Sequence, residues 1–306
     1  MTWLSSLSMT RGEKFAGSNR TAAIRNVLRT FVGILTFFAV HAIGKELPDA
    51  HNLMMKSLAA GEKNEQQLRS YVSRTQSDAK RFEQDGNLKT EEVKTFDDVL
   101  VNGFHVSKLV AKNGKPLTDA DQQKEDSRIA KLVEARKRET PEQHERRLAA
   151  AKEKQEKMWR FAREILDAFD FQMAGEETLN GRKAWVVDAV PHPGYKAKEM
   201  KAEIFLHLTG RVWVDQEDFI WIKADARAVE PFALGFSALA KLDKGAHLFF
   251  EQTRLADGTW VSSRASIKAN ARVAMVAHIA VENLTISENF RKVDPGTRLH
   301  DAKDDF

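Results

Sequence analysis

The sequence predicts a mainly β protein of the α+β class, in which about ten antiparallel strands form a sandwich, a barrel or a strongly curved sheet. Three observations support this prediction. Segments that alternate apolar and polar residues follow one another from residue 67 to residue 293, separated by turn pairs such as Asn180-Gly181 and Asp257-Gly258. A glycine-free segment, 118–169, interrupts the strands with helical composition. The 306-residue chain is 42% hydrophobic and 30% charged, which is typical of a globular protein with one sizeable core.

Residues 1–42 have the pattern of a secretory signal peptide. Basic residues precede an apolar stretch at 31–40, and small residues from Ala42 onward suit a signal peptidase. The sequence has no cysteine that could receive a lipid anchor. We therefore expect cleavage near Ala42, and residues 43–306 should form a single soluble domain in the periplasm. An uncleaved amphipathic or anchoring helix is the alternative interpretation.

The net positive charge comes entirely from this leader. Residues 1–42 hold five basic side chains and one acidic side chain, a balance that equals the +4 of the whole chain. The remaining residues carry 43 side chains of each sign. A formally neutral domain has no general attraction for a polyanion, so nucleic acid is not expected as a partner. The absence of cysteine excludes a thiol nucleophile, a disulfide scaffold and a cysteine-ligated metal.

The first half of the domain alternates between helices and strands. Apolar residues at helical spacing predict a short amphipathic helix over 48–60, which Gly61 should end. Strands are expected over 71–78, up to residue 96, and over 101–112. Segment 118–169 should form an inserted pair of helices, because Thr140 and Pro141 begin a new helix as its N-cap and first residue. We expect the end of the pair to dock on the core and its tip to project into water.

The second half of the domain is a succession of strands. They are expected over 171–179, 183–190, 211–215, 219–228, 247–255, 259–269, 272–282 and 284–293. A short helix around 231–242 is the one optional element. Consecutive hairpins favour a meander.

The apolar faces of these strands predict a cavity. Ile220 and Ile222 alternate with Trp221 and Lys223, so a strand with period two should present one wholly apolar face. Few helices are available to cover a sheet that is apolar on one face and aromatic on part of the other, so we expect an incompletely filled apolar space. The candidate ligand-binding residues are Val212, Val214, Ile220 and Ile222, with Phe232 and Phe236 closing over them.

Motifs for catalysis are incomplete. Leu148 stands where the zinc-protease pattern that begins at His144 needs its second histidine, and segment 235–239 lacks the last glycine of a nucleophile elbow. No glycine-rich phosphate loop occurs. The sequence therefore predicts no catalytic residue, no metal site, no cofactor and no enzymatic activity. A hydrolase whose site is assembled from distant residues stays open as a third hypothesis.

Four segments carry a resemblance to a known family. They are Gly181-Arg-Lys-Ala-Trp185, Pro191-His-Pro-Gly-Tyr195, Gly210-Arg-Val-Trp-Val-Asp215 and Phe219-Ile-Trp-Ile-Lys-Ala-Asp-Ala226. Region 171–293 resembles the outer-membrane lipoprotein-sorting proteins of the LolA-like superfamily, which includes the periplasmic lipoprotein carrier and the RseB-like half-barrels. The resemblance implies an open, curved antiparallel half-barrel with a helical lid, whose concave apolar face receives the acyl chains of lipoproteins. The long inserted helix pair departs from the short carrier, and no lid arginine aligns.

Two functions follow from the residues and the resemblance together. The first is a non-enzymatic periplasmic carrier or binder of hydrophobic ligands, such as lipoprotein acyl chains or other lipids. The alternative is an envelope-stress sensor or interaction module on the same fold. In that case the helix pair would bind a membrane-anchored partner of the cell envelope.

Overall fold

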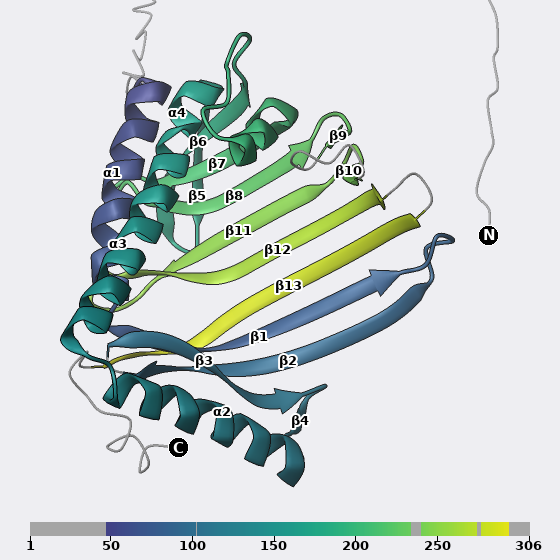
Figure 1. Cartoon of the computed structure of the whole chain (residues 1–306). Coiled ribbons are helices and arrows are strands. Elements are labelled where there is room, and N and C mark those ends of the chain that lie inside the picture. The colour runs from purple at the N-terminus through teal and green to yellow at the C-terminus, as the bar shows by residue number, and fades with distance from the viewer. Residues whose placement is uncertain (1–46, 102, 234–239, 274–276, 294–306) are drawn as a thin grey trace, which may run out of the picture. The chain divides into compact units, whose positions relative to one another are not determined.

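The computed structural model describes residues 47–101, 103–233, 240–273 and 277–293 (Figure 1). The helices in these residues are α1 (Ala50–Leu68), α2 (Asp119–Lys137), α3 (Pro141–Arg163), α4 (Ile165–Ala168) and the 3-10 helix η1 (Met200–His207). The strands are β1 (Tyr71–Phe82), β2 (Leu88–Val101), β3 (Phe104–Lys112), β4 (Lys115–Pro116), β5 (Phe169–Leu179), β6 (Arg182–Pro191), β7 (Leu208–Asp215), β8 (Trp221–Ala228), β9 (Phe232–Ala233), β10 (Ala240–Leu242), β11 (His247–Arg254), β12 (Trp260–Val273) and β13 (Ala277–Lys292).

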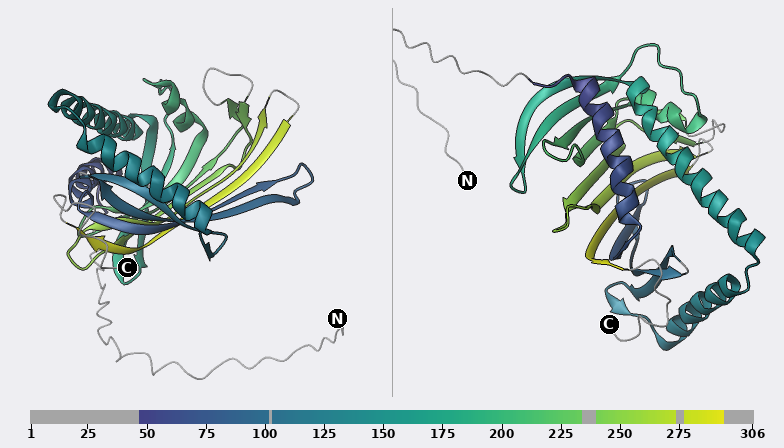
Figure 2. Two further views of the ribbon diagram at one scale, coloured as in Figure 1. Left: turned by 60° about the horizontal axis from the view of Figure 1, so that its bottom comes forward. Right: turned by 90° about the vertical axis from the view of Figure 1, so that its left-hand side faces the viewer.

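The strands of the described residues form one antiparallel sheet with two open edges. Its order is β4-β3-β2-β1-β13-β12-β11-β8-β7-β6-β5, and β10 pairs with β12 and β9 outside this path. The sheet curves toward the side on which α1 and α3 lie, and it does not close (Figure 2). The prediction of a mainly β, curved antiparallel half-barrel is therefore confirmed.

Two-residue turns produce the tight hairpins that the sequence predicts. Asn180 and Gly181 have φ angles of 51° and 79°, and Asn113 and Gly114 have 51° and 71°. Two consecutive residues with positive φ are what a type I′ turn requires, and its twist matches that of the flanking strands. Asparagine and glycine adopt this conformation at little cost.

Helix α1 is longer than expected. Asp49 is its N-cap and accepts a hydrogen bond from the backbone N–H of Asn52, but the helix continues past Gly61 to Leu68. A Cβ atom at Gly61 would lie 3.4 Å from the Trp159 ring of α3. The prediction that Gly61 ends the helix is wrong, because this glycine instead provides close contact with a second helix.

The inserted helix pair joins the two edges of the sheet. The chain runs from β4 through α2, α3 and α4 to β5, so it passes from one edge strand to the other (Figure 2). Helix α2 lies along the outer edge of β3. There, the Glu125 carboxylate accepts from the backbone N–H of Leu109 at 2.8 Å, and Arg128 donates to the carbonyl of Ser107 at 2.6 Å. These bonds satisfy backbone groups that an edge strand otherwise leaves open to another chain.

The turn between α2 and α3 is also anchored to the sheet. Thr140 and Gln143 form a capping box at the start of α3, with Pro141 as its first residue, as predicted. Glu139 binds Arg147 at 2.8 Å and Arg136 at 2.5 Å, and Arg147 lies 3.8 Å from the centre of the Phe104 ring. The hydrogen bond from Arg147, supported by Arg136, lowers the pKa of Glu139 to about 2. The expectation that this tip projects freely into water is therefore wrong.

The last strands differ from the expected division. Segments 272–282 and 284–293 were expected as two strands, but β13 runs unbroken from Ala277 to Lys292. Asn283, which lies between the two expected strands, pairs with Ile267 within the sheet. A short helix was also considered over 231–242. In the structure, the strands β9 and β10 occupy the two ends of this segment, and residues 234–239 lie outside the described residues.

Candidate ligand-binding surface

The two faces of the sheet differ in chemistry. We call the face on which α1 lies the concave face. Strand register from β6 to β13 places on it Trp185, Val187, Ala189, Val212, Val214, Ala224, Ala226, Leu248, Phe250, Ala265, Ile267, Ala269, Val281, Asn283 and Thr285. None of these fifteen described side chains is charged. A surface this uncharged is suited to an apolar partner.

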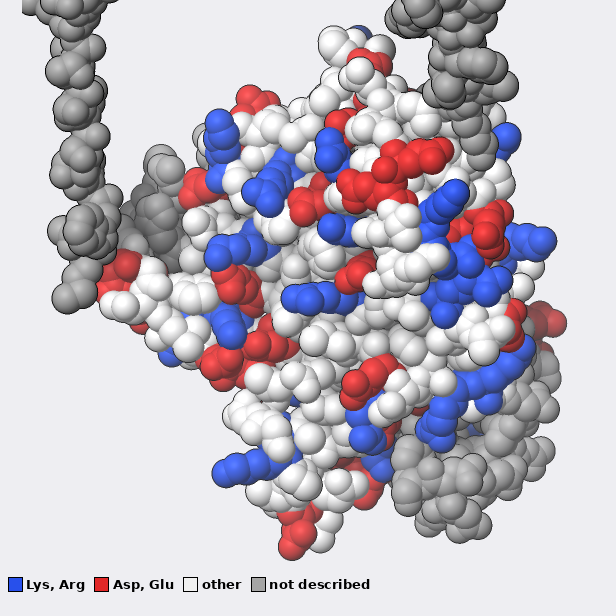
Figure 3. All heavy atoms as spheres, turned by 180° about the vertical axis from the view of Figure 1, so that it is seen from behind, with Lys and Arg blue, Asp and Glu red and all other residues white. Residues whose placement is uncertain are grey.

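The opposite, convex face carries ion pairs between neighbouring strands. Arg211 binds Asp188 at 2.6 Å, Arg74 binds Asp97 at 2.6 Å, and Lys80 binds Glu91 at 3.0 Å. Lys268 and Glu282 form another such pair. Figure 3 shows Lys and Arg interspersed with Asp and Glu over this side of the molecule. Each exposed pair contributes little stability.

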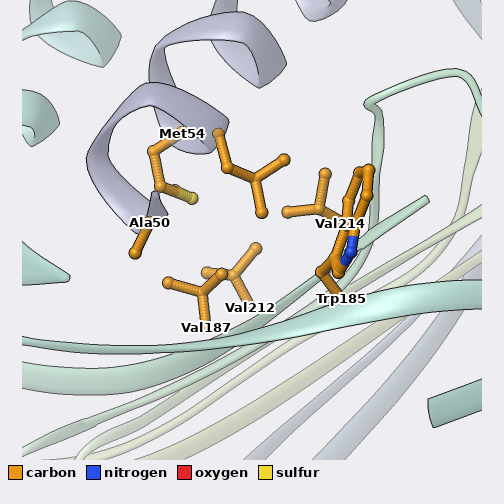
Figure 4. Close-up of a cluster of buried hydrophobic side chains, with 7 residues drawn as sticks. Ala50, Met54, Trp185, Val187, Val212 and Val214 are labelled. Carbon is orange, nitrogen blue, oxygen red and sulfur yellow. The ribbon is translucent and has the colours of Figure 1, made fainter. Parts of the chain in front are cut away.

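Helix α1 covers only one end of the concave face. Its Leu53 and Met54 pack with Val187, Val214 and Trp185 in one buried cluster (Figure 4). Figure 1 shows α1 and α3 crossing the strands near one end. Beyond the helix, an open hollow of 330 Å³ follows β8, β11, β12 and β13. Its lining comprises Ala224, Ala226, Leu248, Phe249, Phe250, Ala265, Ser266, Ile267, Asn283 and Thr285.

A second hollow lies between α1, α3 and the start of β8. It has a volume of 340 Å³, and its apolar lining includes Leu58, Leu68, Met158, Trp159, Ala162, Ile165, Ile220 and Trp221. Trp221 and Ala224, which line different hollows, are three residues apart on β8, a distance of about 10 Å along a strand. Both pack against the cluster beneath α1. The two hollows therefore follow one another along the same strand.

The structure separates the predicted site residues. Val212 and Val214 lie in the cluster beneath α1, whereas Ile220 and Ile222 lie in another cluster with Trp213 and Trp260. Of these four residues, Ile220 also lines the hollow beside α3. The predicted common face for the four is wrong.

A β-bulge in β8 is the reason for this separation. Trp213 pairs with Lys223 and Val214 pairs with Trp221, so Ile222 is an extra residue without an opposite partner. A bulge changes the alternation of side chains along its strand. Ala224 then lies opposite Val212, while Ile222 packs with Val186, Trp213 and Trp260 on the other side of the strand.

The two predicted closing residues have different outcomes. Phe232 is buried among Leu208, Ala228 and Ala246, and its ring stacks on His207 with 4.7 Å between centres. It thus belongs to the packed end of β7 and β8. Phe236 lies outside the described residues.

Sequence reasoning missed most of the residues that line the open hollow. Leu248, Phe250, Ala265, Ile267 and Asn283 were not among the candidates. One sequence pattern could have indicated them. Along β12, the uncharged residues Ala265, Ile267, Ala269 and Ala271 alternate with charged or polar residues. That alternation is typical of a strand with one face in water and the other face covered.

Two residues of the motif at 210–215 have structural roles. Gly210 lies opposite Ala226, and a Cβ atom there would come within 2.7 Å of the Asp225 carbonyl oxygen. Only glycine permits this close approach of β7 and β8. Asp215 is fully buried at the end of β7, where it accepts two hydrogen bonds from Arg182, at 2.6 and 2.7 Å.

Several titratable side chains outside the hollows form pairs. Among the described residues, no three His, Cys, Asp or Glu side chains come together to hold a metal ion. His105 binds Asp98 at 2.5 Å, and this hydrogen bond raises the pKa of His105. No helix within the described ranges is long and apolar enough to span a membrane.

The fold and this surface define an open half-barrel whose concave face is uncharged where the described residues line the larger hollow. No family model and no curated protein matches the chain. Among solved structures, the chain is similar to a putative outer membrane lipoprotein-sorting protein domain from Vibrio parahaemolyticus, at 10% identity and a TM-score of 0.27, over 81% of this chain and 96% of that one. It is similar to a LolA superfamily protein from Nitrosomonas europaea, at 9% identity and a TM-score of 0.27, over 81% and 95% of the two chains.

A third similar structure is the MucA/MucB complex of Pseudomonas aeruginosa, at 9% identity and a TM-score of 0.21, over 81% of this chain and 100% of that one.

Proposed function

We propose that the protein is a periplasmic binder or carrier of ligands with acyl chains, and that the chain lies on the concave face. Lipoprotein acyl chains and other lipids are the ligand class. The uncharged lining of the hollow on the concave face, set against the ion pairs on the convex face, is the observation that carries this proposal. The leader at 1–42, cleaved near Ala42, would deliver residues 43–306 to the periplasm as one domain.

The energetics support an alkyl ligand. Burial of each methylene group stabilises a complex by about 0.8 kcal/mol. The hollow of 330 Å³ is of the size of small-ligand pockets, which begin at about 300 Å³. Ile267 is 44% exposed and Ile279 is 42% exposed, although both lie on the concave face. An acyl chain along β12 would remove this apolar surface from water.

A charge on the concave face should abolish binding without unfolding the protein. In an Ile267→Asp variant, the carboxylate would meet the alkyl chain and lose its hydration. We expect at least a tenfold weaker Kd for a fluorescent acylglycerol, measured by titration. Because Ile267 is already half exposed, the melting temperature should stay close to that of the wild type.

Ile286→Asp is the matched control for this variant. Ile286 is 37% exposed on the convex face, opposite Arg264, so the same substitution there changes the charge equally. It should leave the Kd unchanged. Equal affinities of the two variants for the probe would overturn the proposal.

An interaction module is the second candidate function, and α3 is the element that favours it. Leu148 is exposed, as are the residues that follow it up to Lys154, and Met158 one turn later is also exposed. A helix with exposed apolar residues offers a surface to a membrane-anchored partner of the envelope. Such a module would bind its partner through α3 with the Ile267→Asp substitution in place, whereas a carrier would lose its ligand.

A further inference from the structure

A row of uncharged polar side chains borders the apolar hollow. Asn283 and Thr285 of β13 line it, and Ser77 of β1 lies directly opposite Thr285 on the same face. Asn283 donates through Nδ2 to the Ser77 hydroxyl at 3.2 Å, and the Thr285 hydroxyl donates to Asn283 Oδ1 at 3.2 Å. Thr75 and Ser287 form a further hydroxyl pair at 2.9 Å on the same two strands.

Two side chains of this row have a donor hydrogen that makes no hydrogen bond within the row. An asparagine amide carries two hydrogens, and Asn283 uses one of them toward Ser77. Ser77 accepts that bond, so its own hydroxyl hydrogen is still available. Asn283 lies opposite Ile267, the half-exposed apolar residue of β12. If the alkyl chain of a ligand covers Ile267, the polar group attached to that alkyl chain would therefore lie beside these donors.

The charges on this face lie beyond the row. The lining of the hollow contains no charged side chain in the described residues. Lys94 of β2 lies opposite Ser77, and Glu92 neutralises its ammonium group at 2.7 Å. Arg81 of β1 is exposed and lies opposite Val281. It is two residues from Ala79, which lies opposite Asn283. The contacts of Asn283 in the described residues are with Ser77 and Thr285, so an anion placed there would lose hydration and would meet neutral groups first.

We propose that the row of Asn283, Thr285 and Ser77 recognises the uncharged carbonyl of an acyl ester or acyl amide, next to the alkyl chain bound in the hollow. A carbonyl oxygen accepts hydrogen bonds and carries no charge, which matches spare donors without an adjacent cation. The ligand class is thus an esterified or amidated acyl chain, in preference to a free fatty acid anion. This inference rests on the proposed function.

The test compares three probes of equal chain length: a monoacylglycerol, the corresponding fatty acid at neutral pH, and the alkane. For the wild-type full chain, the monoacylglycerol should bind at least fivefold more tightly than the other two. Asn283→Leu should weaken monoacylglycerol binding about fivefold, the size expected from loss of one hydrogen bond, and leave alkane binding unchanged. Asn283→Asp should weaken monoacylglycerol binding as well, which keeps the test valid if the leucine variant does not fold.

Asn270→Leu is the matched control, because Asn270 is exposed on the convex side of β12, and its affinities should equal those of the wild type. Equal wild-type affinity for all three probes would overturn this inference and leave the proposed function standing. The inference would also be overturned if the fatty acid bound as tightly as the monoacylglycerol and lost this binding in Arg81→Gln. The protein would then recognise a carboxylate and not an uncharged carbonyl. Failure of every probe to bind the wild type would instead remove the proposed function.

Discussion

Replacement of Ile222 by aspartate is expected to unfold most of the protein. Ile222 is 2% exposed and packs among Val186, Trp213 and Trp260. Loss of a large buried side chain together with burial of a carboxylate costs about 5 kcal/mol. A domain of ordinary stability has about 5 to 15 kcal/mol in total. Urea denaturation followed by circular dichroism should show a large fall in the free energy of unfolding.

Ile286→Asp provides the matched comparison, since the same substitution on an exposed residue should change the free energy of unfolding by less than about 1 kcal/mol. The distinction matters for function as well as for stability. If Ile222→Asp stayed as stable as the wild type and lost ligand binding, Ile222 would face the ligand. That result would contradict the bulge in β8 and the assignment of the concave face.

Asp215→Ala is expected to cost about 3 kcal/mol, the second largest effect. The Asp215 carboxylate binds Arg182 through two hydrogen bonds and accepts from the backbone N–H groups of Glu217 and Asp218 at 3.0 and 2.8 Å. Asp215 raises the pKa of Arg182. The ordinary pKa of an arginine already lies far above neutrality, so the guanidinium stays charged when this partner is removed. The Arg182 side chain is only 24% exposed, so water replaces the lost carboxylate poorly.

Glu217→Ala is the control for this second variant. Glu217 also binds Arg182, at 3.0 Å, but its side chain is 78% exposed. An exposed ion pair contributes about 0 to 1 kcal/mol, so this variant should melt close to the wild type. Equal melting temperatures for Asp215→Ala and Glu217→Ala would show that burial of Asp215 is not what holds the β7–β8 turn.

Local signals made much of the fold predictable. The turn at Asn180-Gly181 and the capping box at Thr140 depend on residues within a few positions, and both have the expected geometry. The succession of alternating segments indicated a curved antiparallel sheet for the same reason. In each case, the physical cause lies in the conformational preferences of neighbouring residues.

The candidate site depended on contacts that local patterns do not encode. The bulge at Ile222 is a property of the pairing between β7 and β8, and one extra residue was enough to place Ile222 away from Val212. The two expected strands 272–282 and 284–293 were divided at Asn283, because its partners, Ile267 and Ser77, are remote in sequence and a local pattern does not reveal them. The anchoring of α2 on β3 likewise depends on the hydrogen bond from the backbone N–H of Leu109 to the Glu125 carboxylate, which joins two elements that a local pattern does not connect.

The most direct test of the central claim is to locate a bound acyl chain by photocrosslinking. A monoacylglycerol with a diazirine on its alkyl chain would be bound to the full chain, irradiated, and the modified residues identified by peptide mass spectrometry. We predict modification on the concave face of β8, β11 and β12, at residues such as Ala226, Phe250 and Ile267. Modification confined to the convex face or to α3, with these strands unlabelled, would contradict the account.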